Sequence, residues 1–272
     1  MKQSSPGRPF PAILHMFSTQ TISAWMDRRF YPDYEDSWDN ALFRATILRY
    51  LNPRFKVLDL GAGAGIIPEM NLRGLAQHVV GIDPNPKVVQ NPYLDSAYVG
   101  VAESLPFEAD SFDLVVSANV FEHLTDPVAV LHEVRRVMKP GGILLVKTPN
   151  LWHYVPVLSR VTPFWFHQIY HRYRGGREED VFPTVYRANT PGRLRALAKL
   201  CELPLISVQT VEGRPEYLRV FPPAYCWGLI YERAVNALKV LSAFRVVLIA
   251  VFEKPQPGNC RSLPDVAEHG PQ

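Results

Sequence analysis

The sequence predicts an α/β fold, in which a mostly parallel sheet carries helices on both of its faces. Two observations lead to this class. Short apolar runs typical of buried strands alternate with helical or irregular stretches from residue 56 onward, and a glycine-rich turn follows the first run directly. Parallel strands need crossover segments of this kind, whereas antiparallel strands can be joined by tight turns. The chain therefore favours a right-handed, doubly wound arrangement.

Seven segments are expected to form strands, because each is a short apolar run bounded by polar or turn-forming residues. These segments are residues 56–62, 78–84, 97–103, 112–119, 143–149, 205–211 and 245–254. Helices are expected at residues 37–51, 126–142, 190–203 and 222–244. In the first helix the apolar positions at helical spacing, which should form its inner face, are Leu42, Ala45, Leu48 and Leu51.

One domain is expected, covering residues 37–254, with two additions to its sheet. The stretch at about 150–189 is rich in aromatic, basic and proline residues and is expected to form a lid. The stretch at about 215–244 is longer than a simple connection and is expected to be a helical insertion. Residues 1–36 are interpreted as an N-terminal arm, and residues 255–272, rich in proline and glycine, as a disordered tail.

Composition narrows the class of protein. A hydrophobic content of 47% supports a globular core, and a net charge of +3 is too small to indicate a nucleic-acid partner. The three cysteines are far apart without metal-binding spacing, which favours a cytoplasmic protein. The apolar segment at residues 240–252 is interrupted by Arg245 and is shorter than the about 20 residues that span a bilayer. Peripheral membrane contact through the lid or the helical insertion is left open.

The run "VLDLGAGAGI" at residues 57–66 places three glycines directly after the first strand. Glycine lets a backbone approach a ligand closely and adopts positive φ at little cost. Asp59 suits a positive group beside the ligand, and Asp83, at the end of the second strand, suits the hydroxyls of a ribose. Glu103 follows the third strand and suits a nucleobase edge, with Leu105 and Phe107 beside it. A ligand with an ammonium group, a ribose and a base is S-adenosylmethionine.

Each of these residues also has a simpler interpretation. Glycines after a strand can serve only to make a tight turn, and Asp83 can serve only to cap the segment that begins at Pro84. Their order along the chain, more than any one of them, favours a cofactor site.

Further motifs follow in the same order through residue 150, namely "GIDPNP", "AESLPFEADSFDLVVSANVFEHLTDP" and "EVRRVMKPGGILLVKTPN". Together with the glycine run, they closely resemble the class I S-adenosylmethionine-dependent methyltransferases, particularly the branch that includes the ubiquinone-type O-methyltransferases. This resemblance implies a Rossmann-like sheet of seven strands, the last of them antiparallel. The residues that it assigns to the cofactor are Asp59, Gly61, Ala62, Gly63, Gly65, Asp83, Pro84, Ala102, Glu103 and Asn119.

Methyl transfer to a hydroxyl group also requires removal of its proton. If a helix begins after the fourth strand, Asn119, Glu122 and His123 share one of its faces at the carboxyl edge of the sheet. His123 is the candidate general base, because a near-neutral pKa suits that role. A packing role beside the cofactor is the alternative. The resembled branch carries Glu-x-x-Glu-His here and can bind a divalent metal, but Asn119 replaces the first glutamate, so no metal site is predicted.

The pattern and the resemblance together predict methyl transfer, as O-methylation, to a small molecule such as a sugar, a quinone-like phenol or a lipid-linked intermediate. Two alternatives are kept. The Glu-His pair and the basic lid suit RNA 2′-O-methylation, although no RNA-binding module is recognisable, and a catalytically silent partner protein would also keep the cofactor motifs. A DNA acceptor is not expected, because the fourth strand does not end in [DN]PP[YF]. In the lid, His153, His167 and His171 are further candidate bases.

Overall fold

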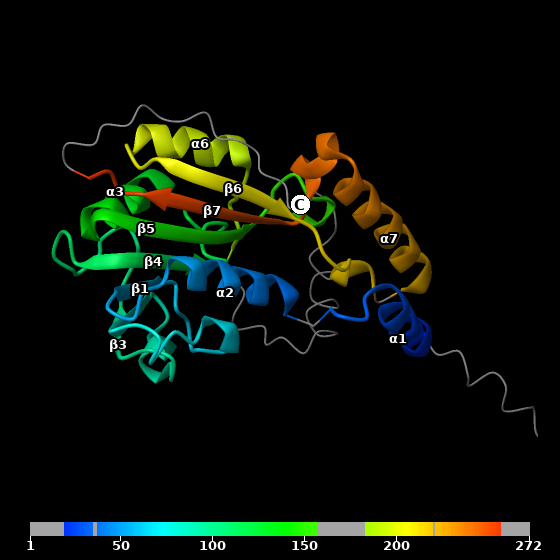
Figure 1. The fold of residues 1–272 in the computed structure, drawn as a ribbon, viewed down its shortest axis with the longest axis horizontal. Helices are drawn as coiled ribbons and strands as arrows, with labels where there is room; N and C mark the ends of the chain where they lie inside the picture. Colours follow the sequence, from blue (N-terminus) through cyan, green and yellow to red (C-terminus); the bar gives the residue numbers. More distant parts are fainter. Residues whose placement is uncertain (1–18, 35–36, 157–182, 220, 257–272) are drawn as a thin grey trace, which may run out of the picture.

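The computed structural model describes residues 19–34, 37–156, 183–219 and 221–256 (Figure 1). Most of the expected lid, including His167 and His171, lies outside the described residues. The same holds for the first 18 residues and for the expected tail from residue 257 onward. The described part is built around a seven-stranded sheet.

The sheet has the strand order β3-β2-β1-β4-β5-β7-β6. The first five strands pair in parallel, and β7 runs antiparallel to both of its neighbours, β5 and β6. This confirms the predicted mostly parallel sheet with an antiparallel last strand. The strands are β1 (Lys56–Leu60), β2 (His78–Asp83), β3 (Ser96–Val99), β4 (Phe112–Ala118), β5 (Met138–Pro149), β6 (Leu205–Val211) and β7 (Val247–Glu253).

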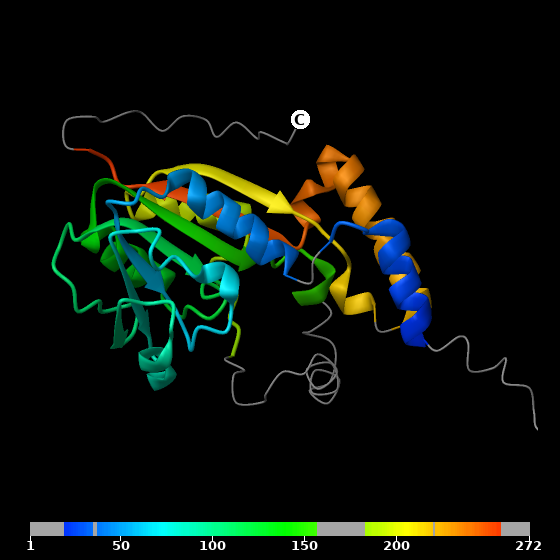
Figure 2. The same cartoon turned by 60° about the horizontal axis from the view of Figure 1, so that its bottom comes forward.

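Alternate residues of the central strands point into two apolar layers, one on each face of the sheet. Leu58 and Val115 belong to one layer, whereas Val57 and Leu114 belong to the other, as the alternation of side chains along a strand requires. The first layer is covered by α3 (Pro127–Val137) and α6 (Pro191–Leu200), and the second by α2 (Trp38–Tyr50) (Figures 1 and 2). The prediction of helices on both faces is confirmed.

The face that α2 buries differs from the expected one. Its buried residues are Phe43, Thr46 and Ile47, whereas Leu48 is 45% exposed. The expectation of an inner face through Leu48 was wrong, because a threonine interrupts the apolar pattern of the true face. The Thr46 hydroxyl donates a hydrogen bond to the Leu42 carbonyl at 3.0 Å, so its polar group is satisfied inside the core.

No helix forms directly after β4, so the condition under which Asn119, Glu122 and His123 would share a helix face is not met. Residues 119–125 make turns, and α3 begins only at Pro127. Asp126 caps α3, because its Oδ1 accepts hydrogen bonds from the backbone amides of Val128 and Ala129. The residues between β4 and this cap therefore do not share a helix face.

Two helices form a further layer beyond one end of the sheet, where they lie side by side in both views (Figures 1 and 2). α1 (Thr19–Phe30), which the sequence pattern did not predict, packs against α7 (Pro222–Ala237) around Met26, Tyr31 and Tyr225. Single turns of 3-10 helix occur at η2 (Pro68–Met70), η3 (Pro86–Gln90), η5 (Glu216–Leu218) and, longer, η6 (Lys239–Phe244). In the part of the chain that the structure describes, no helix is long and apolar enough to cross a membrane.

A buried ion pair lies near the carboxyl end of β5. Lys147 is completely buried, and its ammonium group donates to Asp39 Oδ2 at 2.7 Å and to the side-chain oxygen of Asn40. Both partners belong to the first turn of α2. The contact therefore fixes the start of α2 against the end of β5.

Removing this ion pair should destabilise the fold. Lys147→Ala is expected to lower the free energy of unfolding by about 3 kcal/mol, because it leaves Asp39 without its cation and empties a buried site. The matched control is Lys139→Ala in the same strand. That lysine pairs with Asp113 at 2.8 Å but is 42% exposed, so its loss should cost less than about 1 kcal/mol. Urea unfolding measures both variants, and equal losses would contradict a special role for the buried pair.

Candidate active site

The loop after β1 holds three glycines in a conformation that other residues rarely adopt. Gly61, Gly63 and Gly65 all have positive φ, between 53° and 79°. A Cβ added to Gly61 would lie 2.2 Å from the side chain of Val120, whereas a Cβ on Gly63 would meet nothing within 4 Å. Packing therefore requires glycine at position 61, and Gly63 borders an open space.

Asp83 joins this glycine loop to the loop after β2. Its Oδ2 accepts a hydrogen bond from the backbone amide of Gly63 at 3.0 Å, and its Oδ1 accepts one from the amide of Asn85 at 2.8 Å. Each carboxylate oxygen has a further lone pair. Asp83 thus caps the segment that begins at Pro84 and keeps the capacity to bind a diol, so the two interpretations of this residue are compatible.

Asp59 is a buried carboxyl group next to the glycine loop. The residue is 5% exposed, and no described group donates a hydrogen bond to it. Burial, and after it the negative charge of Asp83, raises the pKa of Asp59 to about 7. A cationic group bound beside Asp59 would supply the counter-charge that the protein itself lacks there.

Asn91 supports the inner side of the glycine loop. Its Nδ2 donates to the carbonyl oxygens of Ala62 at 2.9 Å and Gly63 at 3.2 Å. A Cβ on Gly65 would lie 2.4 Å from the side-chain oxygen of Asn91. The third glycine is therefore explained by packing on Asn91, a residue that no sequence motif singled out.

Ala102 and Glu103 lie in the turn after β3, where both are half-buried. Their expected apolar neighbours serve the core instead. Leu105 is 5% exposed inside the larger apolar layer, and the ring of Phe107 packs edge-on against Phe112 with centroids 5.1 Å apart. The assignment of Ala102 and Glu103 to the cofactor stays a prediction, whereas Leu105 and Phe107 pack in the core.

These residues fit S-adenosylmethionine. The open space at Gly63 suits close contact with the backbone, the uncompensated carboxyl of Asp59 suits an ammonium group, and the remaining lone pairs of Asp83 suit ribose hydroxyls. All of them lie at the carboxyl edge of β1 and β2, next to the point where the strand order reverses between β1 and β4.

A polar cleft of about 430 Å³ lies at the carboxyl ends of β4 and β5. Asn119, the residue after β4, lines the cleft, and the next residue, Val120, lies against Gly61. Asn119 has a φ of 58°, a conformation that asparagine tolerates better than most residues. Its backbone N–H donates a hydrogen bond to the backbone carbonyl of Lys147 at 2.8 Å. Other charged and polar side chains that line the cleft include Asp39, Asn40, Glu122, His153, Glu212, Arg214 and Glu216.

The turn after β4 separates the three residues expected to act on the acceptor. Asn119 and Glu122 line the cleft, whereas His123 is not part of its lining. Glu122 is buried, which raises the pKa of its carboxyl group, and the Thr148 hydroxyl donates to its Oε2 at 2.9 Å. His123 Nδ1 lies 3.0 Å from the Pro183 carbonyl oxygen, and its Nε2 lies 3.9 Å from Glu122 Oε1. His123 therefore contacts the cleft through Glu122.

A buried histidine and a buried carboxyl group form another part of the lining. His153 Nδ1 accepts a hydrogen bond from the Val155 amide at 3.3 Å, so the ring proton lies on Nε2, 3.5 Å from Glu212 Oε2. Burial lowers the pKa of His153 to about 3, and burial raises the pKa of Glu212 to about 8. The lowered pKa makes His153 a poor proton acceptor near neutral pH.

Glu212 and Arg214 were not singled out from the sequence, although both are buried in the cleft lining. They follow the end of β6 directly, just as Asp83 ends β2 and Asn119 follows β4. β6 is parallel to β5, because both are antiparallel to β7. Polar residues at the carboxyl ends of parallel strands are therefore the signal that would have found them.

Within the described ranges, no group of three or more histidine, cysteine, aspartate or glutamate side chains is arranged to hold a metal ion. The ubiquinone-type O-methyltransferases that the sequence resembles carry a further glutamate at the position of Asn119. Here the side-chain amide of Asn119 lines the cleft instead.

Residues 58–146 match the protein family described as "Methyltransferase domain". The matched stretch includes the glycine loop, Asp83, and the wall of the cleft at Asn119 and Glu122. This part of the chain is a methyltransferase domain. S-adenosylmethionine is the methyl donor of its class, which agrees with the fit of the residues around the glycine loop.

Curated relatives match a little more than a third of this chain. The chain is 33% identical over 103 residues to "Ubiquinone biosynthesis O-methyltransferase" of Cereibacter sphaeroides, covering 35% of this chain and 41% of that protein. It is 36% identical over 112 residues to "Probable S-adenosylmethionine-dependent methyltransferase" of Mycolicibacterium smegmatis, covering 39% and 42%. The chain thus matches less than half the length of these relatives, and their acceptors do not transfer to it directly.

Solved structures share the fold of the methyltransferase domain. The chain in complex with the Trm112 methyltransferase activator from Haloferax volcanii superposes with a TM-score of 0.53 at 22% identity, over 86% of this chain and 96% of that one. The [4+2]-cyclase SpnF superposes with a TM-score of 0.52 at 16% identity, over 88% and 97%. At these identities the likeness establishes the fold alone.

Asp59→Asn should separate stability from cofactor affinity. The folded-state pKa of Asp59 is raised from 3.8 to about 7, so the folded state binds the proton more tightly and the cost of ionising Asp59 grows as the pH rises through this window. The variant should therefore melt about 3 °C higher than the parent at pH 8 and at the same temperature at pH 4. If Asp59 receives the ammonium group, affinity for S-adenosylhomocysteine should fall about tenfold.

Thermal melting and calorimetric titration measure the two effects of Asp59→Asn. A variant that melts lower than the parent at pH 8 would contradict the cost of ionising Asp59. A variant that binds S-adenosylhomocysteine with unchanged affinity would contradict the pairing of Asp59 with the ammonium group.

Proposed function

We propose that this chain transfers a methyl group from S-adenosylmethionine to a small-molecule acceptor that binds in the polar cleft. The observation that carries the proposal is that two consecutive residues connect the glycine loop with the cleft. Val120 packs against Gly61 of the glycine loop, and its neighbour Asn119 lines the cleft. When bound, the cofactor supplies an electrophilic methyl group. The enzyme then has to hold a nucleophile in line with it, at roughly 3 Å. A cofactor loop and a cleft that meet at two consecutive residues suit this requirement.

The acceptor is a polar molecule with hydroxyl groups as the favoured nucleophile. The cleft presents the carboxyl groups of Asp39, Glu122 and Glu212 and the amide of Asn119. An apolar ring placed there would leave buried polar groups without partners, at a cost of about 1–3 kcal/mol each. Among the acceptors that the sequence left open, a sugar or the hydroxyl-rich headgroup of a lipid-linked intermediate therefore suits the cleft better than a quinone-like phenol.

We assign the contact with the acceptor to Glu122, which lines the cleft, with His123 next to it in the chain. The raised pKa of the buried Glu122 makes it a stronger proton acceptor than an ordinary carboxylate. His123 Nε2, at 3.9 Å from Glu122 Oε1, is positioned to influence that carboxyl group or to receive its proton. His123 thus remains the candidate base of the sequence pattern, but we infer that it acts through Glu122.

We also place the protein in the cytoplasm. Cys201, which is buried, and Cys226, which is exposed, are both free thiols. Free cysteines are typical of a reducing compartment.

Calorimetric titration with S-adenosylmethionine, and separately with S-adenosylhomocysteine, tests the cofactor site. Micromolar binding of both is expected, and Asp83→Ala should weaken it at least about tenfold, because the ribose hydroxyls lose their acceptor. Asp83→Asn keeps one acceptor oxygen and should lose less. Melting curves of both variants check that the loops remain folded. No binding of either ligand by the parent would overturn the proposed function.

A screen with a labelled methyl group and hydroxylated acceptors tests the chemistry in the cleft. Once an acceptor is found, Glu122→Gln should lower the rate at saturating cofactor about 100-fold or more, in the range typical of general-base removal. His123→Ala should lower it less and shift the pH at which the rate is half-maximal. Both variants should bind S-adenosylhomocysteine as the parent does. An unchanged rate in Glu122→Gln would contradict its assignment as the proton acceptor.

A further inference from the structure

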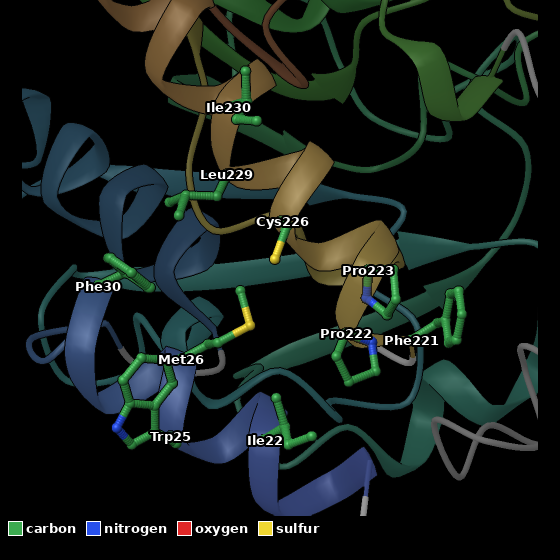
Figure 3. Close-up of a pocket in the computed structure, with 10 residues that line it drawn as sticks. All are labelled: Ile22, Trp25, Met26, Phe30, Phe221, Pro222, Pro223, Cys226, Leu229 and Ile230. Atoms are coloured by element: carbon green, nitrogen blue, oxygen red, sulfur yellow. The ribbon is translucent and has the colours of Figure 1, made fainter.

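An apolar groove lies between α1 and α7 (Figure 3), and it shares no lining residue with the polar cleft. It has a volume of about 720 Å³, and only apolar side chains and one cysteine line it. Figure 3 shows Ile22, Trp25 and Phe30 of α1 on one side and Phe221, Cys226 and Ile230 of the α7 region on the other. Neither the methyltransferase domain at residues 58–146 nor the proposed reaction involves this groove.

The rim of the groove exposes large apolar side chains. Trp25 is 55% exposed, Phe221 is 58% exposed and Ile230 is 59% exposed. Trp227, one turn of α7 before Ile230, is 72% exposed. Single exposed apolar residues are common on protein surfaces, but several on two adjoining helices form a patch that marks an interaction surface.

The exposed charges of α1 and α7 are positive. Arg28 and Arg29 follow Trp25 by three and four positions, and Arg233 follows Ile230 by three, so each lies near an exposed apolar residue on the same helix. All three arginines are exposed. Asp33, just after α1, is an exposed acidic residue nearby.

The acidic residues of the two helices point inward. Asp27 accepts hydrogen bonds from Tyr225 Oη and from Arg219 Nη2 at 2.6 Å. Glu232 is buried and accepts from Tyr31 Oη at 3.0 Å and from Asn236 Nδ2 at 2.7 Å. Glu232 Oε2 also lies 3.4 Å from Arg233 Nε, but the Arg233 side chain stays 60% exposed. The described outer surface of these helices therefore combines apolar and cationic groups.

We propose that α1 and α7 form a docking surface for an anionic lipid bilayer. Tryptophan, phenylalanine and isoleucine at the rim suit the boundary between headgroups and acyl chains, and tryptophan is enriched there because its ring is apolar and its N–H is polar. Arg28, Arg29 and Arg233 suit lipid phosphates by charge complementarity. A second copy of this chain suits the surface less well, because a two-fold contact would bring the same cationic groups of both copies together.

An ion-pair network connects α1 to the wall of the polar cleft. Arg214 lines the cleft, and its Nη1 lies 3.8 Å from Asp27 Oδ1 of α1. Arg219, which precedes α7, binds both Asp27 and Glu216 at 2.6 Å. The docking surface and the cleft are thus joined by one network of ion pairs. The lipid surface goes beyond the proposed reaction and does not depend on which acceptor the cleft takes.

Vesicle flotation of the full chain tests this surface. The protein should float with phosphatidylcholine vesicles that contain phosphatidylglycerol and should not float with vesicles of phosphatidylcholine alone. Binding should weaken when salt is raised from about 50 to about 500 mM, because the electrostatic part is screened. Trp25→Ser combined with Trp227→Ser, and separately Arg28→Gln, Arg29→Gln and Arg233→Gln together, should each reduce the bound fraction at low salt about tenfold or more.

Matched controls come from α6, on the sheet. Leu200 is 63% exposed and Arg195 is exposed, so Leu200→Ser and Arg195→Gln remove an apolar and a cationic group of the same kind elsewhere. Both controls should bind vesicles as the parent does. Melting temperature and S-adenosylhomocysteine binding, measured on every variant, distinguish loss of docking from loss of fold and from failure of the proposed function.

Three outcomes would overturn the proposal. The first is the absence of flotation with anionic vesicles, and the second is flotation that neither α1–α7 variant reduces. The third is a dimer in sedimentation velocity that the double tryptophan variant dissociates while anionic vesicles are not bound. That result would assign the surface to a second copy of this chain.

Discussion

The ion pair between Lys147 and Asp39 is the contact on which the geometry of the cleft depends. The ammonium group of Lys147 holds the first turn of α2, whose Asp39 and Asn40 line the cleft. The backbone carbonyl of Lys147 accepts a hydrogen bond from the backbone N–H of Asn119, the residue that follows β4. One residue of β5 therefore positions two walls of the cleft. A completely buried lysine is costly, and its pairing with α2 offsets that cost.

The parallel sheet then brings the remaining groups to the same edge. Asp83 ends β2, Asn119 follows β4, and Glu212 follows β6, so residues far apart in the sequence meet around one space. Burial at this edge raises the pKa of Asp59 and Glu212 because little solvent reaches them. The site thus contains carboxyl groups whose charge is not balanced by the protein, and a bound cationic group would stabilise the ionised form of Asp59.

Local patterns in the sequence predicted the sheet and the cofactor loop, because strand periodicity and glycine spacing act over short distances. Three features escaped prediction for physical reasons. The inner face of α2 contains Thr46, whose hydroxyl is satisfied by its own helix and which breaks the apolar pattern. His123 was expected beside Glu122 on a helix, but the cap at Asp126 starts α3 later. Glu212 became part of the site only through the pairing of β6 with β7, a contact between distant parts of the chain.

The position of β7 has a consequence for how the protein folds during synthesis. Among the described residues β7 is the last strand along the chain, yet it lies between β5 and β6 and pairs with both. Until residue 253 has left the ribosome, β5 and β6 each keep an open edge, and the sheet cannot close. Nascent chains that end before β7 would therefore expose two unpaired apolar edges, which makes them candidates for chaperone binding. At that stage the cofactor loop, in the other half of the sheet, is already synthesised.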